Sequence, residues 1–144
     1  MNKAYKPAGD DKLLLQIALL DFIQYTIGVL HTSCPADLRY SIGEQLELYL
    51  TDVYTAITLS IHLLEETPAY IKDKGPVEVK RWKEQKHREV MKIMEEADSK
   101  WVKAKGIWNI LLKTDHLADR KVTVWKQVGE IGRYFYGWRK YCWH

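Results

Sequence analysis

The chain has 144 residues, a size at which one domain can bury a hydrophobic core without disulfide bonds. Its net charge of +3 hides an asymmetry, because residues 1–70 carry 4 Lys/Arg against 9 Asp/Glu and residues 71–144 carry 18 against 10. We expect a single domain over residues 1–144 whose second half would attract a polyanionic partner. A solvated helix rich in lysine and glutamate gives the same charge count, so that interpretation stays open.

The two cysteines, Cys34 and Cys142, are too few and too far apart for a disulfide framework or a zinc site. The start of the chain, from Met1 to Lys12, is polar, and no cleavage pattern follows the apolar run after it. We therefore expect a cytoplasmic protein.

The run from Leu13 to Leu30 is the one membrane candidate in the sequence. Asp21 lies at its centre, and a central aspartate costs about 2.5 to 3.5 kcal/mol on insertion scales. We expect a soluble helix that ends near His31, before Pro35. Its apolar residues lie nearly all round, which predicts a second neighbour such as another subunit. The alternative is a central helix in a crowded monomer.

A second helix is predicted from Leu38 to Glu66, where apolar residues recur at intervals of three and four. Pro68 should stop it, and residues 67–76 should form a turn. The stripe comprises Ile42, Leu46, Tyr49, Leu50, Val53, Ile57, Ile61 and Leu64.

The third predicted helix, Glu78 to Lys113, would be about 50 Å long at 1.5 Å per residue. Either it breaks near Gly106 or its first half projects beyond the bundle. Glu84 and Arg88 have the favourable spacing for an ion pair along the helix. The predicted seam comprises Val79, Trp82, Val90, Ile93, Ala97, Trp101, Ala104, Trp108 and Leu111.

After a turn around residues 114–118, with Asp119 as the expected N-cap, a last helix is predicted from Val122 to Tyr141. Each glycine inside it costs up to about 1 kcal/mol relative to alanine. Gly129 and Gly132 share a face on which another backbone could approach closely. The four predicted helices and the lack of any convincing strand indicate an all-α protein. The expected architecture is an antiparallel up-down four-helix bundle with an extended second/third helix hairpin.

The sequence offers little for catalysis. The five histidines are scattered, and only Glu84 and His87 have the Glu-x-x-His spacing of a di-iron bundle, a pair that would have to occur on two helices. Gly129 to Gly132 lies inside a helix and follows no strand, so it is no phosphate loop. We expect no enzyme, no metal, no cofactor and no small-molecule substrate.

Basic residues alternate with aromatic ones near the C-terminus, a pattern that can grip phosphate and stack rings. Aromatic residues at helical spacing are more often core, and Trp125 and Phe135 are expected there. Arg139, Lys140 and Trp143 lie at the end of the helix and are the better candidates for contact.

Two segments resemble a known family. The C-terminal segment Val128-Gly-Glu-Ile-Gly-Arg-Tyr-Phe-Tyr-Gly-Trp138 is similar to the closing signature of the accessory variability determinant (Avd) proteins of diversity-generating retroelements. The segment Cys34-Pro-Ala-Asp-Leu-Arg-Tyr-Ser-Ile-Gly-Glu-Gln-Leu46 is similar to the family's entry into its second helix. That entry is shared by bacterial four-helix-bundle proteins, including those encoded in ribosomal-RNA intervening sequences. The likeness covers the first two helices and the last third of the chain.

The resemblance implies a non-enzymatic bundle that assembles as a homopentamer with a positively charged surface. It also implies binding of a reverse transcriptase and of template RNA or an RNA/DNA hybrid, in support of mutagenic cDNA synthesis. By motif position, the resemblance implies that close helix packing occurs at Gly129, Gly132 and Gly137. It also implies that Trp138 makes an anchoring contact and that Arg133 is the matching basic residue.

Residues 67–97 depart from the family pattern and look like an insertion. Six Lys/Arg lie between Lys80 and Lys92, and we hypothesise a basic arm for RNA or the polymerase through Lys80, Arg81, Arg88 and Lys92. One rival is an oligomeric structural or protein-interaction bundle without a nucleic-acid role. Another is a cofactor-holding bundle, which would carry colour or metal after purification.

Overall fold

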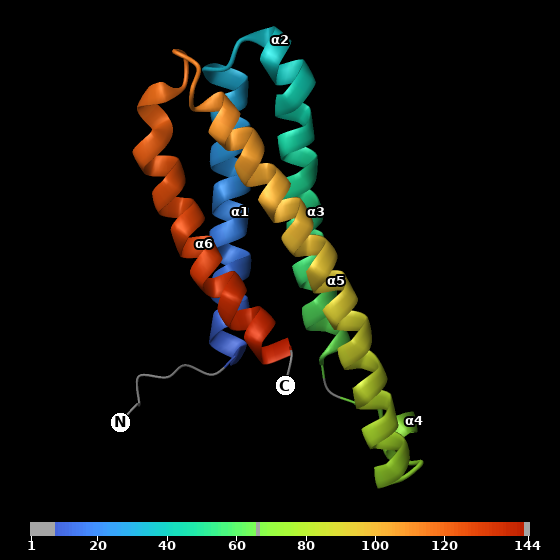
Figure 1. Cartoon of the computed structure of the whole chain (residues 1–144). Coiled ribbons are helices and arrows are strands. Elements are labelled where there is room, and N and C mark those ends of the chain that lie inside the picture. Colours follow the sequence, from blue (N-terminus) through green and yellow to red (C-terminus); the bar gives the residue numbers. More distant parts are fainter. Residues whose placement is uncertain (1–7, 66, 143–144) are drawn as a thin grey trace, which may run out of the picture.

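The computed structural model describes residues 8–65 and 67–142, and within them every regular element is a helix. The long ones are α1 (Ala8–Thr32), α3 (Glu44–Leu63), α5 (Pro76–Leu111) and α6 (Lys121–Cys142). In Figure 1 they form a helical bundle, in which α3 packs chiefly against α5 and α1 chiefly against α6. The all-α class predicted from the sequence is confirmed.

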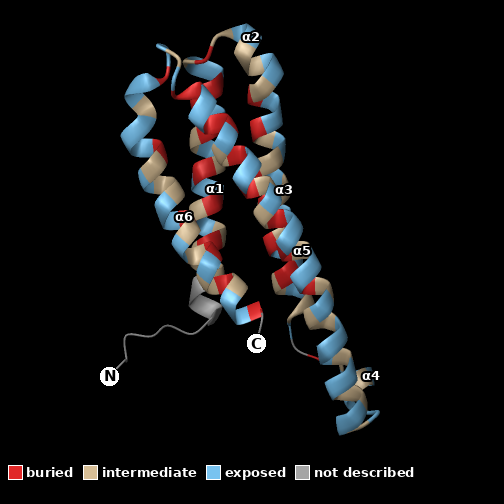
Figure 2. Cartoon of the chain, in the orientation of Figure 1, coloured by how far each residue is buried: buried red, intermediate tan, exposed pale blue. Residues whose placement is uncertain are grey.

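The core lies between the long helices, and Figure 2 shows the buried residues on their inward faces. The stripe predicted for the second helix supplies Leu46, Leu50, Val53 and Ile57, all with 0% exposure. At the centre, the Phe22 ring lies 6.1 Å from the rings of both Trp101 and Trp108, measured between centroids. Phe135 is buried and Trp125 packs against the core in part, as expected.

The link between α1 and α3 is helical for most of its length. Pro35 precedes the short helix α2 (Ala36–Leu38), which continues into a π-helical segment, η2 (Arg39–Gly43). The continuous helix predicted to Glu66 is therefore wrong in two details. It contains a π-helical turn, and it ends at Leu63.

Gly43 lies where the backbone approaches neighbouring atoms closely. A Cβ there would lie 3.3 Å from Cδ2 of Leu30 and 3.3 Å from the carbonyl oxygen of Leu38. The sequence pattern instead predicts this role for Gly129 and Gly132. At both of those positions an added Cβ would meet nothing within 4 Å in the described residues. The prediction that Gly129 and Gly132 allow close helix packing is therefore wrong for contacts within the described chain.

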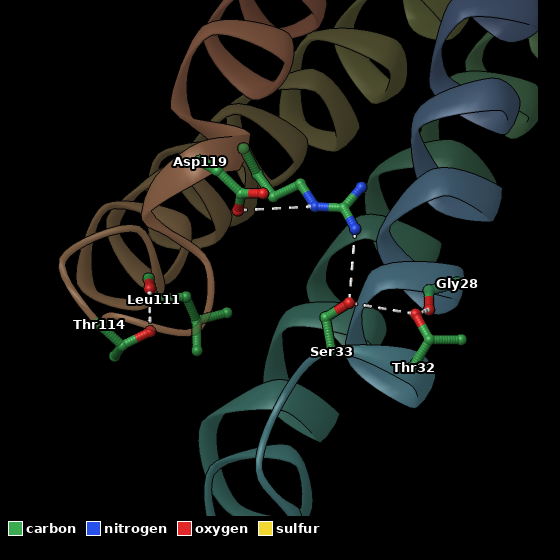
Figure 3. A network of polar contacts seen from close by, with 7 residues as sticks. Gly28, Thr32, Ser33, Leu111, Thr114 and Asp119 are labelled. Atoms are coloured by element: carbon green, nitrogen blue, oxygen red, sulfur yellow. Dashed lines mark hydrogen bonds and ion pairs between the residues drawn. The ribbon is translucent and has the colours of Figure 1, made fainter.

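A polar cluster ties the start of α6 to the end of α1 (Figure 3). Arg120, in the short 3-10 helix η3 (Ala118–Arg120), donates from Nη2 to Oγ of Ser33 at 3.4 Å. Its Nε lies 3.9 Å from the carboxylate of Asp119. Asp119 thus lies inside the 3-10 turn and pairs with a neighbouring side chain, whereas α6 begins at Lys121, so the predicted N-cap is wrong.

Helix α5 runs without a break through Gly106, and its first half projects beyond the other helices (Figure 1). The segment expected to be a plain turn contains another short helix, α4 (Ala69–Lys72), which packs on α5. Gly75 makes the reversal between them at a φ of 99°, which a side chain would strain. We call residues 69–92 the arm. None of residues 68–89 is buried (Figure 2).

Candidate partner-binding surfaces

The arm carries cationic side chains that no carboxylate of the described residues neutralises. Lys80, Lys83, Arg88 and Lys92 are all exposed, and within the described chain they make no hydrogen bond or ion pair. The expected pairing of Arg88 with Glu84 is absent. Arg81 differs from its neighbours, because its Nη1 lies 3.0 Å from the carboxylate of Glu78.

An open pocket of about 920 Å³ lies between the arm and the C-terminal end of α6. We call it the basic pocket. One face of α5 provides most of its lining, with an apolar floor that includes Val79 and Met91. Five of its lining side chains are basic and one is acidic. The basic ones are Lys72, Lys80, Lys83, His87 and Arg88, and the acidic one is Glu84.

His87 connects the arm to the end of α6. Its Nδ1 lies 2.9 Å from the backbone oxygen of Cys142, so the imidazole donates its Nδ1–H to that carbonyl. The bond satisfies one of the last carbonyls of α6, which have no partner inside the helix. It also fixes the two walls of the basic pocket relative to each other, because Cys142 lines the pocket as well.

The sequence-based prediction found part of this site. Lys80 and Arg88 line the basic pocket, whereas Arg81 and Lys92 do not. The prediction missed Lys83 and the role of His87. A signal was present, because Lys80, Lys83 and His87 lie at spacings of three and four and so share a helix face.

The C-terminal residues proposed for contact are divided by the structure. Lys140 and Arg133 are exposed, and the Arg133 guanidinium lies 5.2 Å from the Tyr134 ring centroid. Arg139 is half-buried and pairs with Asp98 of α5, at 3.4 Å between Nη1 and Oδ2. Trp143 lies outside the described residues. Only the end of α6 reaches the arm; Arg133 lies more than two turns back along the helix.

Trp138 is a core residue, which corrects its assignment to a contact surface. Its side chain is 1% exposed, and its Nε1 donates to Oγ of Ser60 at 2.9 Å. The hydroxyl of Ser60 in turn donates to the carbonyl of Ile57 at 2.7 Å. Trp138 therefore anchors α6 to α3 and offers no ring to a base. Gly137 lies within α6, which continues to Cys142.

Both cysteines are buried. Burial raises the pKa of the Cys142 thiol to about 12 and also raises the pKa of Cys34. Because the thiolate is the reactive form, neither residue is suited to nucleophilic chemistry near neutral pH. Across the part of the chain that the structure describes, no three His, Cys, Asp or Glu side chains gather as metal ligands.

Helix α1 leaves an apolar stripe uncovered. Leu13, Ile17, Leu20 and Ile27 are 40–56% exposed and recur at helical spacing on one face. By length and composition, Lys12–Thr32 is also apolar enough to cross a membrane, with a mean hydropathy of 1.8. One such helix is weak evidence for a membrane span, since core helices of soluble proteins can be equally long and apolar. The opposite face of α1 is packed in the core through Leu15, Leu19 and Phe22.

Comparisons with known proteins leave the family open. No protein-family model, no curated protein and no solved structure matches this chain.

Proposed function

We propose that this chain is a non-enzymatic accessory protein of a diversity-generating retroelement. In this role it binds the reverse transcriptase and the template RNA and so supports mutagenic cDNA synthesis. The proposal combines the resemblance of the two segments described above with one structural observation. That observation is the set of unpaired cations on an arm that stands clear of the bundle.

The proposed architecture is an antiparallel up-down four-helix bundle made of α1, α3, α5 and α6. Support comes from the short connections between successive long helices, which favour antiparallel neighbours. The pairing of α1 with α3, of α3 with α5 and of α5 with α6 agrees with that order.

The cations of the arm suit a polyanion. Lys80, Arg88 and Lys92 keep their charge uncompensated within the described chain, so each can displace counterions from a phosphate. The sequence places most of the positive charge of the protein in residues 71–144, which adds long-range attraction. A compact bundle would present such charges on a flat surface, whereas the arm can reach along a duplex or into a polymerase.

Assembly into a homo-oligomer, with five copies as the resemblance implies, would cover two surfaces of the bundle. The first is the apolar stripe of α1, whose burial would stabilise association by about 25 cal/mol per Å². The second is the face of α6 around Gly129 and Gly132, where the space for an added Cβ is open. A helix of a neighbouring copy could approach the backbone closely there.

The proposal is tested by light scattering of the purified protein, alone and with a structured RNA, at low and moderate salt. We expect a closed oligomer of about five subunits that takes up RNA in a salt-sensitive manner. Reversing Lys80, Arg81, Arg88 and Lys92 to glutamate should weaken binding. The slope of log K against log salt should become shallower by about 0.9 for each phosphate that the variant no longer neutralises.

A control variant reverses four exposed lysines away from the arm, with the same change in net charge: Lys103, Lys113, Lys121 and Lys126. It should retain more RNA affinity than the arm variant. Equal losses in the two variants would show that net charge alone drives binding, and unchanged binding in the arm variant would remove the arm's role.

The second candidate is an oligomeric structural or protein-interaction bundle without a nucleic-acid role. The observation in its favour is the uncovered apolar stripe of α1, which calls for association whether or not RNA is bound. It predicts an oligomer that ignores RNA at every salt concentration.

A further inference from the structure

The basic pocket differs from an ordinary cationic surface because its floor is apolar. Val79 and Met91 lie a little over three turns apart along the face of α5 that lines it. Lys80, Lys83 and Arg88 also line the pocket, and none of these three cations has a partner in the described residues. The pocket therefore offers apolar contact and positive charge to the same ligand.

We propose that the basic pocket binds an acidic, amphipathic peptide segment of a partner protein. Apolar side chains spaced along that segment pack against Val79 and Met91, and carboxylates of the segment pair with Lys80, Lys83 and Arg88. The inference rests on the proposed function, because it specifies the kind of partner that the arm holds.

Charge complementarity decides the sign of the ligand. Among the described lining residues, the cations Lys80, Lys83 and Arg88 have no partner in the described chain, and the carboxylate present is that of Glu84. A basic or neutral segment would leave these cations uncompensated next to an apolar floor. An acidic segment neutralises them.

The apolar part of the lining suits a peptide side chain. Single-stranded nucleic acid is held by phosphate contacts together with bases stacked on aromatic rings. The lining residues of the basic pocket include no Phe, Tyr or Trp in the described part of the chain. A floor of Val79 and Met91 instead suits an aliphatic side chain, and a cavity of about 920 Å³ has room for more than one.

The pocket is also held in shape before any ligand binds. The bond from Nδ1 of His87 to the carbonyl of Cys142, at 2.9 Å, joins its two walls. Arg139 adds a second tie between α6 and α5 through Asp98. A preformed pocket binds with a smaller loss of conformational entropy than one that must be assembled around the ligand.

The test uses fluorescence anisotropy with the full chain and three labelled probes. The first is an amphipathic peptide with leucines at intervals of three and four and with glutamates on the opposite face. The second is the same peptide with each leucine replaced by serine, and the third is oligouridylate. We expect the first peptide to bind about tenfold or more tightly than the serine version, because only the first can use the apolar floor.

Two pocket variants separate the contributions. The floor variant carries Val79→Ser and Met91→Gln, which remove apolar surface without adding charge, at positions that are not fully buried. The rim variant carries Lys80→Gln and Lys83→Gln, which removes charge from exposed side chains and leaves the fold intact. A control changes Lys113 and Lys121, which are exposed and far along the chain from the arm, to glutamine.

The floor and rim variants should each weaken binding of the leucine peptide by about tenfold or more, and the control should not. The floor variant should leave oligouridylate binding unchanged. The inference is overturned if the floor variant binds the leucine peptide as the unmodified protein does, or if it loses the peptide and oligouridylate equally. Salt-sensitive RNA uptake without peptide binding removes this inference alone, whereas the absence of both removes the proposed function as well.

Discussion

The two halves of α5 show what the rest of the chain does for a helix. From residue 90 onward, α5 buries at least one residue in each turn, including Val90, Met94 and Trp101. In the same half, Lys100 pairs with Asp52 of α3 at 2.9 Å. From residue 76 to residue 89 it buries none, and several of its cations have no partner in the described residues. The second half of α5 contributes to the stability of the bundle through its buried side chains. The first half is held mainly by hydrogen bonds within its own helix, so its side chains are available to bind a partner.

The largest expected contrast is between a tryptophan in the core and one on the arm. Trp138→Ala should lower the free energy of unfolding by about 3 to 5 kcal/mol, because it empties a fully buried site and removes the bond to Ser60. Trp82→Ala, at a half-exposed ring on the arm, should cost about 1 kcal/mol. Denaturant unfolding monitored by circular dichroism measures both.

A milder variant, Trp138→Phe, keeps most of the ring and loses the hydrogen bond, with an expected cost of about 1 to 2 kcal/mol. Similar losses for Trp82→Ala and Trp138→Ala would mean that the arm is packed against something in solution.

The second prediction compares two glycines with different surroundings. Gly43→Ala places a methyl group 3.3 Å from the Leu30 side chain and should destabilise the protein by about 1 to 3 kcal/mol. Gly129→Ala meets open space in a helix and should stabilise the folded chain by about 0.5 to 1 kcal/mol. Thermal unfolding of the two variants reports the sign.

Gly129→Ala also bears on assembly. If a second copy packs on that face, the added methyl group should lower the mass seen by light scattering even as the single chain becomes more stable. An unchanged mass would place the interface elsewhere, with the apolar stripe of α1 as the remaining candidate.

The smallest effect concerns two lysines of α5. Lys100→Met removes a half-exposed ion pair with Asp52 and should lower the free energy of unfolding slightly, because solvent screens the pair. Lys80→Met removes a cation without a partner in the described residues and should change the free energy of unfolding by less than about 0.5 kcal/mol. Unfolding at low and high salt separates them, because salt should reduce the difference. A larger loss at Lys80 would contradict the description of the arm as unpacked.

The sequence by itself determined the helical class, the approximate helix bounds and most of the buried stripes. The seam predicted for the third helix is wrong at Val79 and Trp82, which lie on the arm and are not buried. These features follow from local periodicity, and the stripe with Leu46, Leu50 and Val53 lies in the core as expected. Local signals also located the cation-rich segment from Lys80 to Lys92. The uncovered apolar residues of α1 were likewise anticipated, because one partner face could not bury them all.

Tertiary structure alone decided which residues are free to act. Trp138, Arg133 and Lys80 look alike as surface candidates in the sequence, yet Trp138 is enclosed between helices and the other two are exposed. The close approach at Gly43 and the bond from His87 to Cys142 join residues far apart in the chain. No periodicity within one helix can specify such contacts, because they depend on how separate helices are placed. The basic pocket likewise depends on the placement of separate helices, because its lining comes from α5 and from the end of α6.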